Sequence, residues 1–384
     1  MRAFLRAAVA STVLAAAPAF PAGEDDLQAR VQAQLEEART KAGFPGVTAA
    51  VALPDGRVLA AAAGWADPAH RVPLTVSSRM PAGSVGKTFV AAVVLQAVDE
   101  QLLDLDSPIE RWIGVEPWFH RIPNAEALTL RLLLGHRSGI PEVLENDAFV
   151  KAVTSDLDRA WRPLDLLEFV FDKKPHAPAG VKFLYTDMNY TIAGVVFEHA
   201  VGKPLFEEIE RRILKPQGLD QTLPQEHRDW RGVVPGFVDR KNPMLHGVKA
   251  PDGTTLRDGR FLYAIQAEYA GGGLISTSPD LARWAVQLWE GRVFSAARLR
   301  DMLDGKPAEE GSRYGLGVSI ASSNAGPVYT HDGWTPGYQT QIVYFPELKL
   351  GAALQINSDP MKKYKLGPGA CLGQVVSVVV HALR

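Results

Sequence analysis

The stretch Arg79–Asp104, RMPAGSVGKTFVAAVVLQAVDEQLLD, organises the rest of the chain. From Phe89 to Val98 nearly every residue is apolar, which is typical of a helix that is buried on all sides. Ser84 stands where such a helix would begin, and Lys87 lies one turn later on the same face. We therefore expect a central buried helix with a serine and a lysine side by side at its start.

Two interpretations of this Ser84–Lys87 pair are open. The first turn of a buried helix is the positive end of the helix dipole and is poor in water, and both effects favour a neutral lysine amine. A neutral amine beside a hydroxyl is a general base beside a nucleophile. The alternative is an N-cap serine followed by a solvated lysine, because S-x-x-K spacing often arises by chance. Gly86 costs a helix about 1 kcal/mol relative to alanine and predicts that something approaches the backbone closely there.

Composition and charge limit the function classes. The chain has 384 residues, 46% hydrophobic and 22% charged, as in an ordinary soluble globular protein of one large or two joined domains. Its formal net charge is −2, from 41 basic and 43 acidic residues, and no dense Lys/Arg block indicates nucleic acid or an anionic membrane surface. Cys371 is the only cysteine and has no obvious base nearby in sequence. No His/Cys/Asp spacing indicates a metal, and no cofactor is expected.

The N-terminus predicts a secretory signal peptide over residues 1–22. Arg2 and Arg6 precede an apolar run from Ala7 to Ala17, and Ala17-Pro18-Ala19 is a small-x-small cleavage candidate. The alternative is a membrane anchor, but the run is well short of the ~20 residues that a span needs. We therefore expect a periplasmic or secreted protein without stable membrane insertion. Export without an internal disulfide suits the bacterial periplasm.

Hydrophobic periodicity predicts strands near both chain ends and a mostly helical middle. Residues 25–41 are mostly polar with apolar residues at helical spacing, which predicts a helix that ends at Gly43. Two short apolar runs on either side of Pro54-Asp55-Gly56 indicate a β-hairpin. The glycines at 271–273 indicate a tight turn rather than a phosphate loop. Residues 128–140 are predicted as a helix that is stopped by a turn at 135–139. The remaining elements are predicted as helices at 164–170, 188–201 and 279–289, strands at 47–53, 57–64, 314–321, 339–345 and 350–357, and pocket-rim loops at 217–261.

This order predicts that the two ends meet in one sheet, with the middle as a second lobe at its edge. The expected division is an α/β lobe from residues 23–85 and 265–384 and a helical lobe from residues 86–264. The tail 374–384 is ambiguous, because its valines favour a strand while its length and position allow a helix.

Two further clusters lie far from Ser84 in the sequence. One is Tyr185-Thr186-Asp187 and the other is His331-Asp332-Gly333-Trp334. Each alone is unremarkable, since Tyr185 could be a buried core tyrosine and His331 a histidine at a strand end. A third candidate, His136, lies in a Gly/Ser turn, where a histidine usually hydrogen-bonds local backbone.

Taken in order, the three clusters resemble the serine β-lactamase and penicillin-binding superfamily, which carries S-x-x-K, then Y-x-N, then K-T-G or H-x-G. The branch with class C β-lactamases, D-alanyl-D-alanine carboxypeptidases, D-aminopeptidases and related esterases is the most similar. Leu132–Pro141 and Gly271–Leu281 also match its LLxHTSGIP and GGLxSTxxDL segments. The resemblance covers essentially all of the chain after the signal peptide. It implies an antiparallel sheet flanked by helices, an inserted mostly helical lobe, an active site between the lobes and a helical C-terminal tail.

The resemblance also implies roles for individual residues. Ser84 would attack a carbonyl to form an acyl-enzyme, with Lys87 and Tyr185 sharing its proton and Tyr185 activating the water that releases the acyl group. Lys87 and His331 would lower the pKa of Tyr185. The backbone N–H groups of Ser84 and Trp334 would form the oxyanion hole. The implied substrate-binding residues are Asp187, His331, Asp332, Gly333 and Trp334.

Two departures from the family pattern bear on the substrate. Asp187 stands where asparagine is usual, and could form an ion pair with Lys87. Asp332 stands where β-lactamases and carboxypeptidases commonly have a hydroxyl that helps to hold a substrate carboxylate. At ~4 Å and an effective dielectric of about 20, the like-charge cost is roughly 4 kcal/mol, so we expect carboxylate-bearing substrates to be poor ones.

The sequence thus predicts an exported serine hydrolase that cleaves an ester or amide bond in a small molecule or peptide. The alternatives are a D-alanyl-D-alanine carboxypeptidase, a D-aminopeptidase, a true class C β-lactamase or a non-catalytic cell-wall-binding protein. The sequence predicts no oligomeric state.

Overall fold

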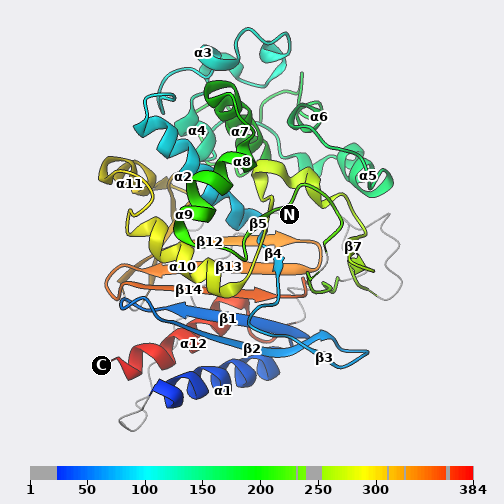
Figure 1. The fold of residues 1–384 in the computed structure, drawn as a ribbon. Helices are drawn as coiled ribbons and strands as arrows, with labels where there is room; N and C mark the ends of the chain where they lie inside the picture. The colour runs from blue at the N-terminus through cyan, green and yellow to red at the C-terminus, as the bar shows by residue number, and fades with distance from the viewer. Residues whose placement is uncertain are drawn as a thin grey trace.

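The computed structural model describes residues 24–230, 232–238, 253–308, 311–323, 326–359 and 364–383, so the predicted signal peptide lies outside the described residues. Within these ranges, nine strands form one antiparallel sheet in the order β3-β2-β1-β14-β13-β12-β11-β10-β9 (Figure 1). Strands from the two ends of the chain meet where β1 pairs with β14, which confirms the expected fold class. The domain boundaries stay a prediction. The strands of this sheet are β1 (Gly46–Ala52), β2 (Val58–Asp67), β3 (Val72–Pro73), β9 (Lys306–Pro307), β10 (Arg313–Tyr314), β11 (Ser319–Ser323), β12 (Gly326–Thr335), β13 (Tyr338–Phe345) and β14 (Leu350–Ile356).

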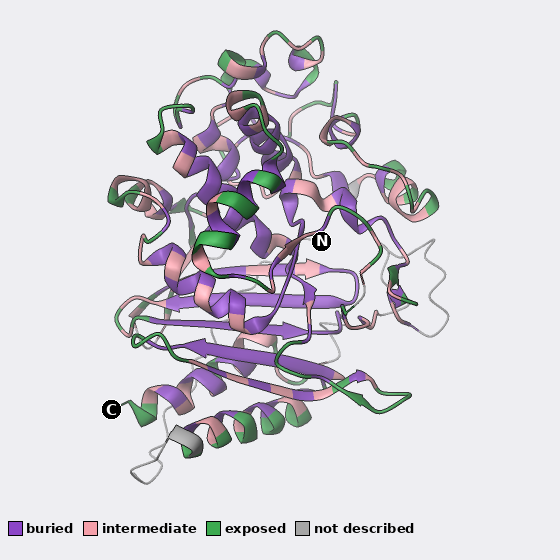
Figure 2. Cartoon of the chain, in the orientation of Figure 1, coloured by how far each residue is buried: buried purple, intermediate pink, exposed green. Residues whose placement is uncertain are grey.

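Helices cover both faces of the sheet. The first and last helices, α1 (Glu24–Ala42) and α12 (Pro368–Ala382), pack together on one face, and α10 (Ser278–Trp289) packs on the other (Figure 1). Every residue of β1 and β14 is buried, because both faces of these strands are covered (Figure 2). The outer strand β2 is only partly covered, and its residues alternate between buried and half-buried through most of its length.

The C-terminal tail is a helix, as the family resemblance implies. Its valines favour a strand locally, but Val375, Val376 and Val379 share one face of α12 and pack into the core between the sheet and α1. Cys371 is on the same buried face, and burial raises the pKa of its thiol to about 12, which leaves it unreactive.

The second layer is a mostly helical lobe around α2 (Gly86–Asp99). Phe89 to Leu95 are at most 1% exposed, so this helix is buried on all sides as its composition predicts. Phe89 stacks on Trp284 of α10, which joins the lobe to the sheet. None of the helices in the described ranges combines the length and apolar character needed to cross a bilayer. The other helices are α3 (Glu110–Ile113), α4 (Leu130–Leu134), α5 (Asp147–Ser155), α6 (Pro163–Leu167), α7 (Asp187–Val201), α8 (Leu205–Ile209), α9 (Lys215–Gln217) and α11 (Ala296–Leu303).

Two predicted elements differ in the structure. The strand expected at 314–321 is divided into β10 and β11, because the backbone between them turns at Gly317, whose φ is +75°. The helix expected within 128–140 is α4, which starts two residues later than expected and ends at the turn at Gly135, as predicted.

A second, small sheet brings two turns of the chain together. It contains β4 (Met80–Pro81), β8 (Leu274–Ser276) and β5 (Leu223–Pro224), in the order β4-β8-β5. β4 leads directly into the Ser84 turn, and β8 directly follows the glycines at 271–273. This pairing therefore sets the glycine turn against the start of α2.

Candidate active site

Ser84 lies in a single 3₁₀ turn, Gly83–Val85, that joins β4 to α2. Gly83 has a φ of +52°, and a Cβ there would lie 2.6 Å from the backbone nitrogen of Trp334 on β12. A Cβ on Gly333 would lie 1.9 Å from the carbonyl oxygen of Ala82. Both glycines are required because the Ser84 turn and β12 meet backbone to backbone.

The side chains of Ser84 and Lys87 meet as their spacing predicts. Lys87 is fully buried, and its Nζ donates to Ser84 Oγ at 2.9 Å and to Asp187 Oδ1 at 2.5 Å. A third acceptor is the carbonyl oxygen of Gly271. All three ammonium donors therefore have acceptors.

This environment makes Lys87 a cation, and the expectation of a neutral amine is wrong. Burial lowers the pKa of Lys87, but the charge of Asp187 and the neighbouring Tyr185 raise it by more, so that it lies above its ordinary value. The helix dipole and burial favour a neutral amine, but the ion pair with Asp187 that the family comparison suggested is present. A carboxylate brought in from α7, a hundred residues away, outweighs both.

Gly86 is confirmed as a point of close backbone approach. A Cβ at this position would lie 1.6 Å from the carbonyl oxygen of Gly272. The glycine turn at 271–273 therefore lies directly against the first turn of α2. This contact places the Gly271 carbonyl where Lys87 donates to it.

Tyr185 faces the same pair of residues. The Lys87 Nζ lies 5.0 Å from the centre of the Tyr185 ring, and hydrogen bonding with Lys87 and Ser84 lowers the pKa of the phenol. Burial has the larger effect and raises the pKa to about 12. The expectation that this pKa is lowered is therefore wrong, and Tyr185 is neutral in the free protein.

His331 cannot supply the positive charge expected of it. Its Nε2 accepts from the Tyr314 hydroxyl at 2.8 Å, while its Nδ1 donates to the backbone carbonyl of Asp332 at 2.8 Å. Burial, followed by the charge of Lys87, lowers the pKa of His331 to about 3. Both ring nitrogens are thus occupied and the imidazole is neutral.

Asp332 and Trp334, the other residues of the third motif, lie differently relative to the pocket. Trp334 lines the pocket in front of Ser84, whereas Asp332 is not among the described lining residues. Asp332 Oδ1 instead accepts from Gln341 Nε2 across the β12–β13 pair at 2.8 Å. Burial raises the pKa of Asp332 to about 6.

Asp187 is placed by the start of α7. Thr186 caps this helix by accepting from the backbone N–H of Met188, and Asp187 is the first helical residue. A carboxylate is favoured at a helix N-terminus. Its side chain is 23% exposed while that of Lys87 is fully buried, so Asp187 is the member of the ion pair that water can reach.

Two buried glutamates close to Asp187 are absent from the sequence-based prediction. Both oxygens of Glu142 accept backbone N–H groups, from Leu144 and Asp187, at 2.9 Å. Glu268 lies in the 3₁₀ segment Ile265–Gly271. Burial first and the charge of Asp187 second raise the pKa of each glutamate to about 8. Their only signal in the sequence is that they border the two segments that match the family.

His136 and Tyr314 form an aromatic support behind the site. The His136 ring stacks on Tyr185 at a centroid distance of 4.0 Å, and its Nδ1 accepts from the Thr186 backbone at 3.3 Å and from the Asn189 side chain. The hydrogen-bond partners of the His136 side chain are therefore about fifty residues later in the sequence, whereas we expected them in the backbone of its own turn. His136 therefore positions Tyr185 and the start of α7.

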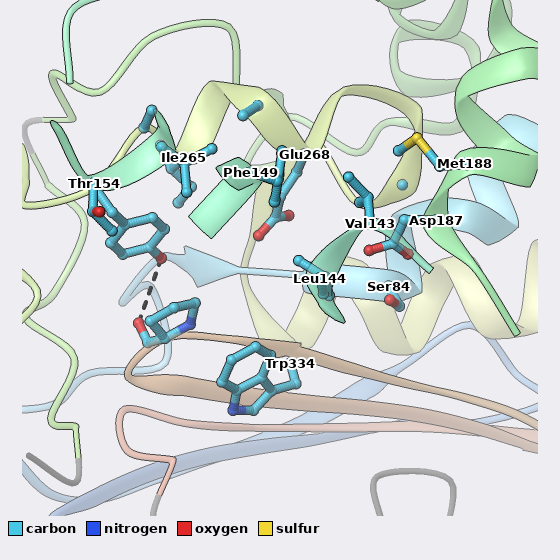
Figure 3. A pocket seen from close by; sticks show the side chains of 16 residues that line it. Ser84, Val143, Leu144, Phe149, Thr154, Asp187, Met188, Ile265, Glu268 and Trp334 are labelled. Carbon is cyan, nitrogen blue, oxygen red and sulfur yellow. Dashed lines mark hydrogen bonds between the residues drawn. The ribbon is translucent and has the colours of Figure 1, made fainter. Parts of the chain in front are cut away.

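A pocket with an empty volume of about 740 Å³, including its open mouth, extends from Ser84. Its walls are mainly apolar, and the carboxylates of Asp187 and Glu268 face the same space as Ser84 and Trp334 (Figure 3). The predicted rim at 217–261 lies partly outside the described residues, and its described parts contribute no lining residue. The apolar lining includes Val143, Leu144, Phe149, Met188, Ile265 and Pro336.

Known proteins are similar to this chain in sequence and in fold. The chain is 24% identical over 306 residues to the putative penicillin-binding protein PbpX of Bacillus subtilis (strain 168), covering 77% of this chain and 69% of that protein. It is 29% identical over 206 residues to the D-aminopeptidase of Brucella anthropi, covering 52% of this chain but only 38% of that protein. Among solved structures, the D-amino acid amidase of Ochrobactrum anthropi SV3 complexed with D-phenylalanine matches with a TM-score of 0.79 and 25% identity, over 93% of this chain and 99% of that one.

The family model described as Beta-lactamase matches residues 28–368, which is most of the chain. The match includes the Ser84 turn, α7 and β12, so it covers every residue of the site described above. The chain therefore belongs to the Beta-lactamase family and is a serine hydrolase of that fold, related to penicillin-binding proteins and D-aminopeptidase.

Proposed function

We propose that the protein hydrolyses an ester or amide bond through an acyl-enzyme on Ser84. The observation that carries this proposal is the hydroxyl of Ser84 at the base of an open pocket, 2.9 Å from the Nζ of a buried lysine. A serine is a weak nucleophile unless a neighbouring group accepts its proton. Lys87 and Tyr185 are the two groups placed to do so.

The free site must first lose one proton. Lys87 is charged and Tyr185 is neutral, so neither can accept the Ser84 proton in this state. Asp187 contacts both the ammonium and solvent, and provides the path by which that proton leaves. Neutral Lys87 then takes the Ser84 proton as the hydroxyl attacks the carbonyl, and Tyr185 returns a proton to the leaving group.

The developing oxyanion requires donors close to Ser84. The backbone N–H groups of Ser84 and Trp334 are the proposed pair, supported by the close approach of the Ser84 turn to β12 at Gly83 and Gly333. Removal of one such donor typically lowers the rate by about 10²–10³. His331 acts indirectly, because its ring is held by Tyr314 and by its own strand.

The test is intact-protein mass spectrometry after mixing with a p-nitrophenyl ester and, separately, a penicillin. We expect transient acylation and turnover with the ester, and a fall of at least roughly 10³-fold in Ser84→Ala. Stable acylation by the penicillin would instead favour a peptidoglycan peptidase, and rapid penicillin turnover a β-lactamase. Failure of the ester, the penicillin and a fluorophosphonate to label Ser84 would favour a non-catalytic binding protein.

We also propose that the protein is exported to the periplasm or secreted, on the basis of residues 1–22. N-terminal sequencing of protein recovered from a periplasmic extract should give a start near residue 23. Recovery of the chain with Met1 intact in the cytosol would contradict export.

A further inference from the structure

Glu268 is a buried carboxylate whose contacts within the protein leave part of it unsatisfied. Its Oε2 is buried and has no hydrogen-bond partner, whereas both oxygens of Glu142 accept backbone N–H groups. Figure 3 shows the Glu268 carboxylate pointing into the pocket rather than into the protein core. A buried carboxyl oxygen without a hydrogen-bond partner is costly, which indicates a partner that arrives from outside.

The position of Glu268 is next to the nucleophile. A Cβ on Gly272 would lie 2.4 Å from Glu268 Oε2 and 3.1 Å from the carbonyl carbon of Gly83, the residue before Ser84. Gly272 thus lies between the Glu268 carboxyl group and the Ser84 turn and contacts both. A group bound by Glu268 would lie beside the bond that Ser84 attacks.

The charges of the pocket favour a cation. Asp187 and Glu268 both line it, and no lysine or arginine is among the described lining residues. The Lys87 ammonium is already directed at Ser84, Asp187 and Gly271. The rest of the wall is apolar and has room for a hydrophobic side chain.

We propose that Glu268, with Asp187, binds the protonated amine of the substrate, so that the preferred substrates are amides or esters of α-amino acids with a free amine and an apolar side chain. This inference rests on the proposed Ser84 hydrolase. Leu144, Phe149 and Ile265 receive the apolar side chain. Blocking or removing the amine costs affinity because it leaves Glu268 Oε2 without a hydrogen-bond partner.

A consequence of this pairing is proton release on binding. Burial and the charge of Asp187 raise the pKa of Glu268 to about 8, so the free carboxyl holds a proton near pH 7. A bound ammonium favours the ionised carboxylate and displaces that proton. A purely structural Glu268 would not link binding to proton release.

The first experiment compares phenylalanine amide, in both enantiomers, with phenylpropionamide, which lacks only the amine. We expect the amine to raise kcat/KM in the wild type, and Glu268→Gln to lower kcat/KM for the amino amide by roughly 10–100-fold more than it lowers that for phenylpropionamide. The control is Glu226→Gln, which removes the same charge at an exposed position next to Gln225 and should leave the preference intact. Equal losses on both substrates would overturn the proposal.

The second experiment measures binding without chemistry. Calorimetry of phenylalanine amide with Ser84→Ala, in buffers that differ in ionisation heat, should show proton release near pH 7 that diminishes above about pH 8. The double variant with Glu268→Gln should lose most of the release. Binding without proton release in Ser84→Ala would overturn the proposal even if Glu268→Gln does not fold. If p-nitrophenyl ester turnover still depends on Ser84, that outcome leaves the hydrolase function standing, whereas absence of Ser84 acylation would remove the function itself.

Discussion

Lys87 Nζ lies 2.5 Å from Asp187 Oδ1, so the residue expected to act as a neutral base is held as a cation in the free protein. Members of the family that carry asparagine at this position would lack the negative charge. The Asp187 carboxylate thus controls when the site can accept the Ser84 proton.

Asp187→Asn should shift the pH dependence of hydrolysis. Loss of the carboxylate leaves burial as the main influence on Lys87, and burial lowers its pKa. We expect the acid limb of kcat/KM for a neutral p-nitrophenyl ester to move down by about 1 pH unit or more. An unchanged acid limb would show that Lys87 is not the group that must lose a proton.

Gly86→Ala adds only one methyl group but should destabilise the protein strongly. The new Cβ would lie 1.6 Å from the Gly272 carbonyl oxygen, so backbone must move, at a cost of about 1–3 kcal/mol or more in free energy of unfolding. The matched control is Gly373→Ala, an exposed helical glycine of α12 whose Cβ would have no neighbour within 4 Å. This control should gain up to about 1 kcal/mol in urea unfolding. Similar effects of the two changes would contradict the close approach.

The fold, the central helix and the role of Gly86 could be predicted because short stretches of sequence indicate them. The all-apolar run after Ser84 predicts a buried helix, and α2 is one. The glycine at position 86 predicts a close backbone approach, and Gly272 makes it. Strand patterns at both chain ends predicted the sheet that the two ends form together. The family resemblance carried by the three motifs predicted the helical tail, which valine propensity alone would have made a strand.

The protonation states could not be predicted in the same way. The charge of Lys87 depends on the ion pair with Asp187, which the departure from the family pattern suggested but which the residues around Lys87 do not indicate. The neutrality of His331 depends on Tyr314 and burial, which the residues around His331 do not indicate. Glu142 and Glu268 have no motif of their own. They matter because folding buries both of them near Asp187.

The stability of the protein should fall as pH rises through the range in which Glu268 ionises. The folded pKa of about 8 exceeds the ordinary value of 4.5, so between these values the folded state binds more protons than the unfolded state. The contribution of Glu268 to the free energy of unfolding is therefore fully present below about pH 4.5 and is lost as pH rises through about 8. Glu268→Gln cannot ionise, so its melting temperature should decline less steeply between about pH 5 and 9. Parallel curves for the wild type and Glu268→Gln, with Glu226→Gln as the control, would contradict the raised pKa.

Asp332→Thr should improve acylation by penicillins. Asp332 accepts a hydrogen bond from Gln341 and its pKa is raised to about 6 by burial, so it is mostly ionised near pH 7. In that state it would repel a substrate carboxylate by up to roughly 4 kcal/mol at ~4 Å and an effective dielectric of about 20. The wild type should therefore acylate more readily with penicillin, relative to a neutral ester, below about pH 6 than near pH 8, and Asp332→Thr should remove this dependence. The ratio of the two acylation rates corrects for the ionisation of Lys87, because both substrates need the same nucleophile. Efficient cephalosporin hydrolysis by the wild type, or a rate ratio that Asp332→Thr leaves unaltered, would show that Asp332 does not exclude carboxylate-bearing substrates.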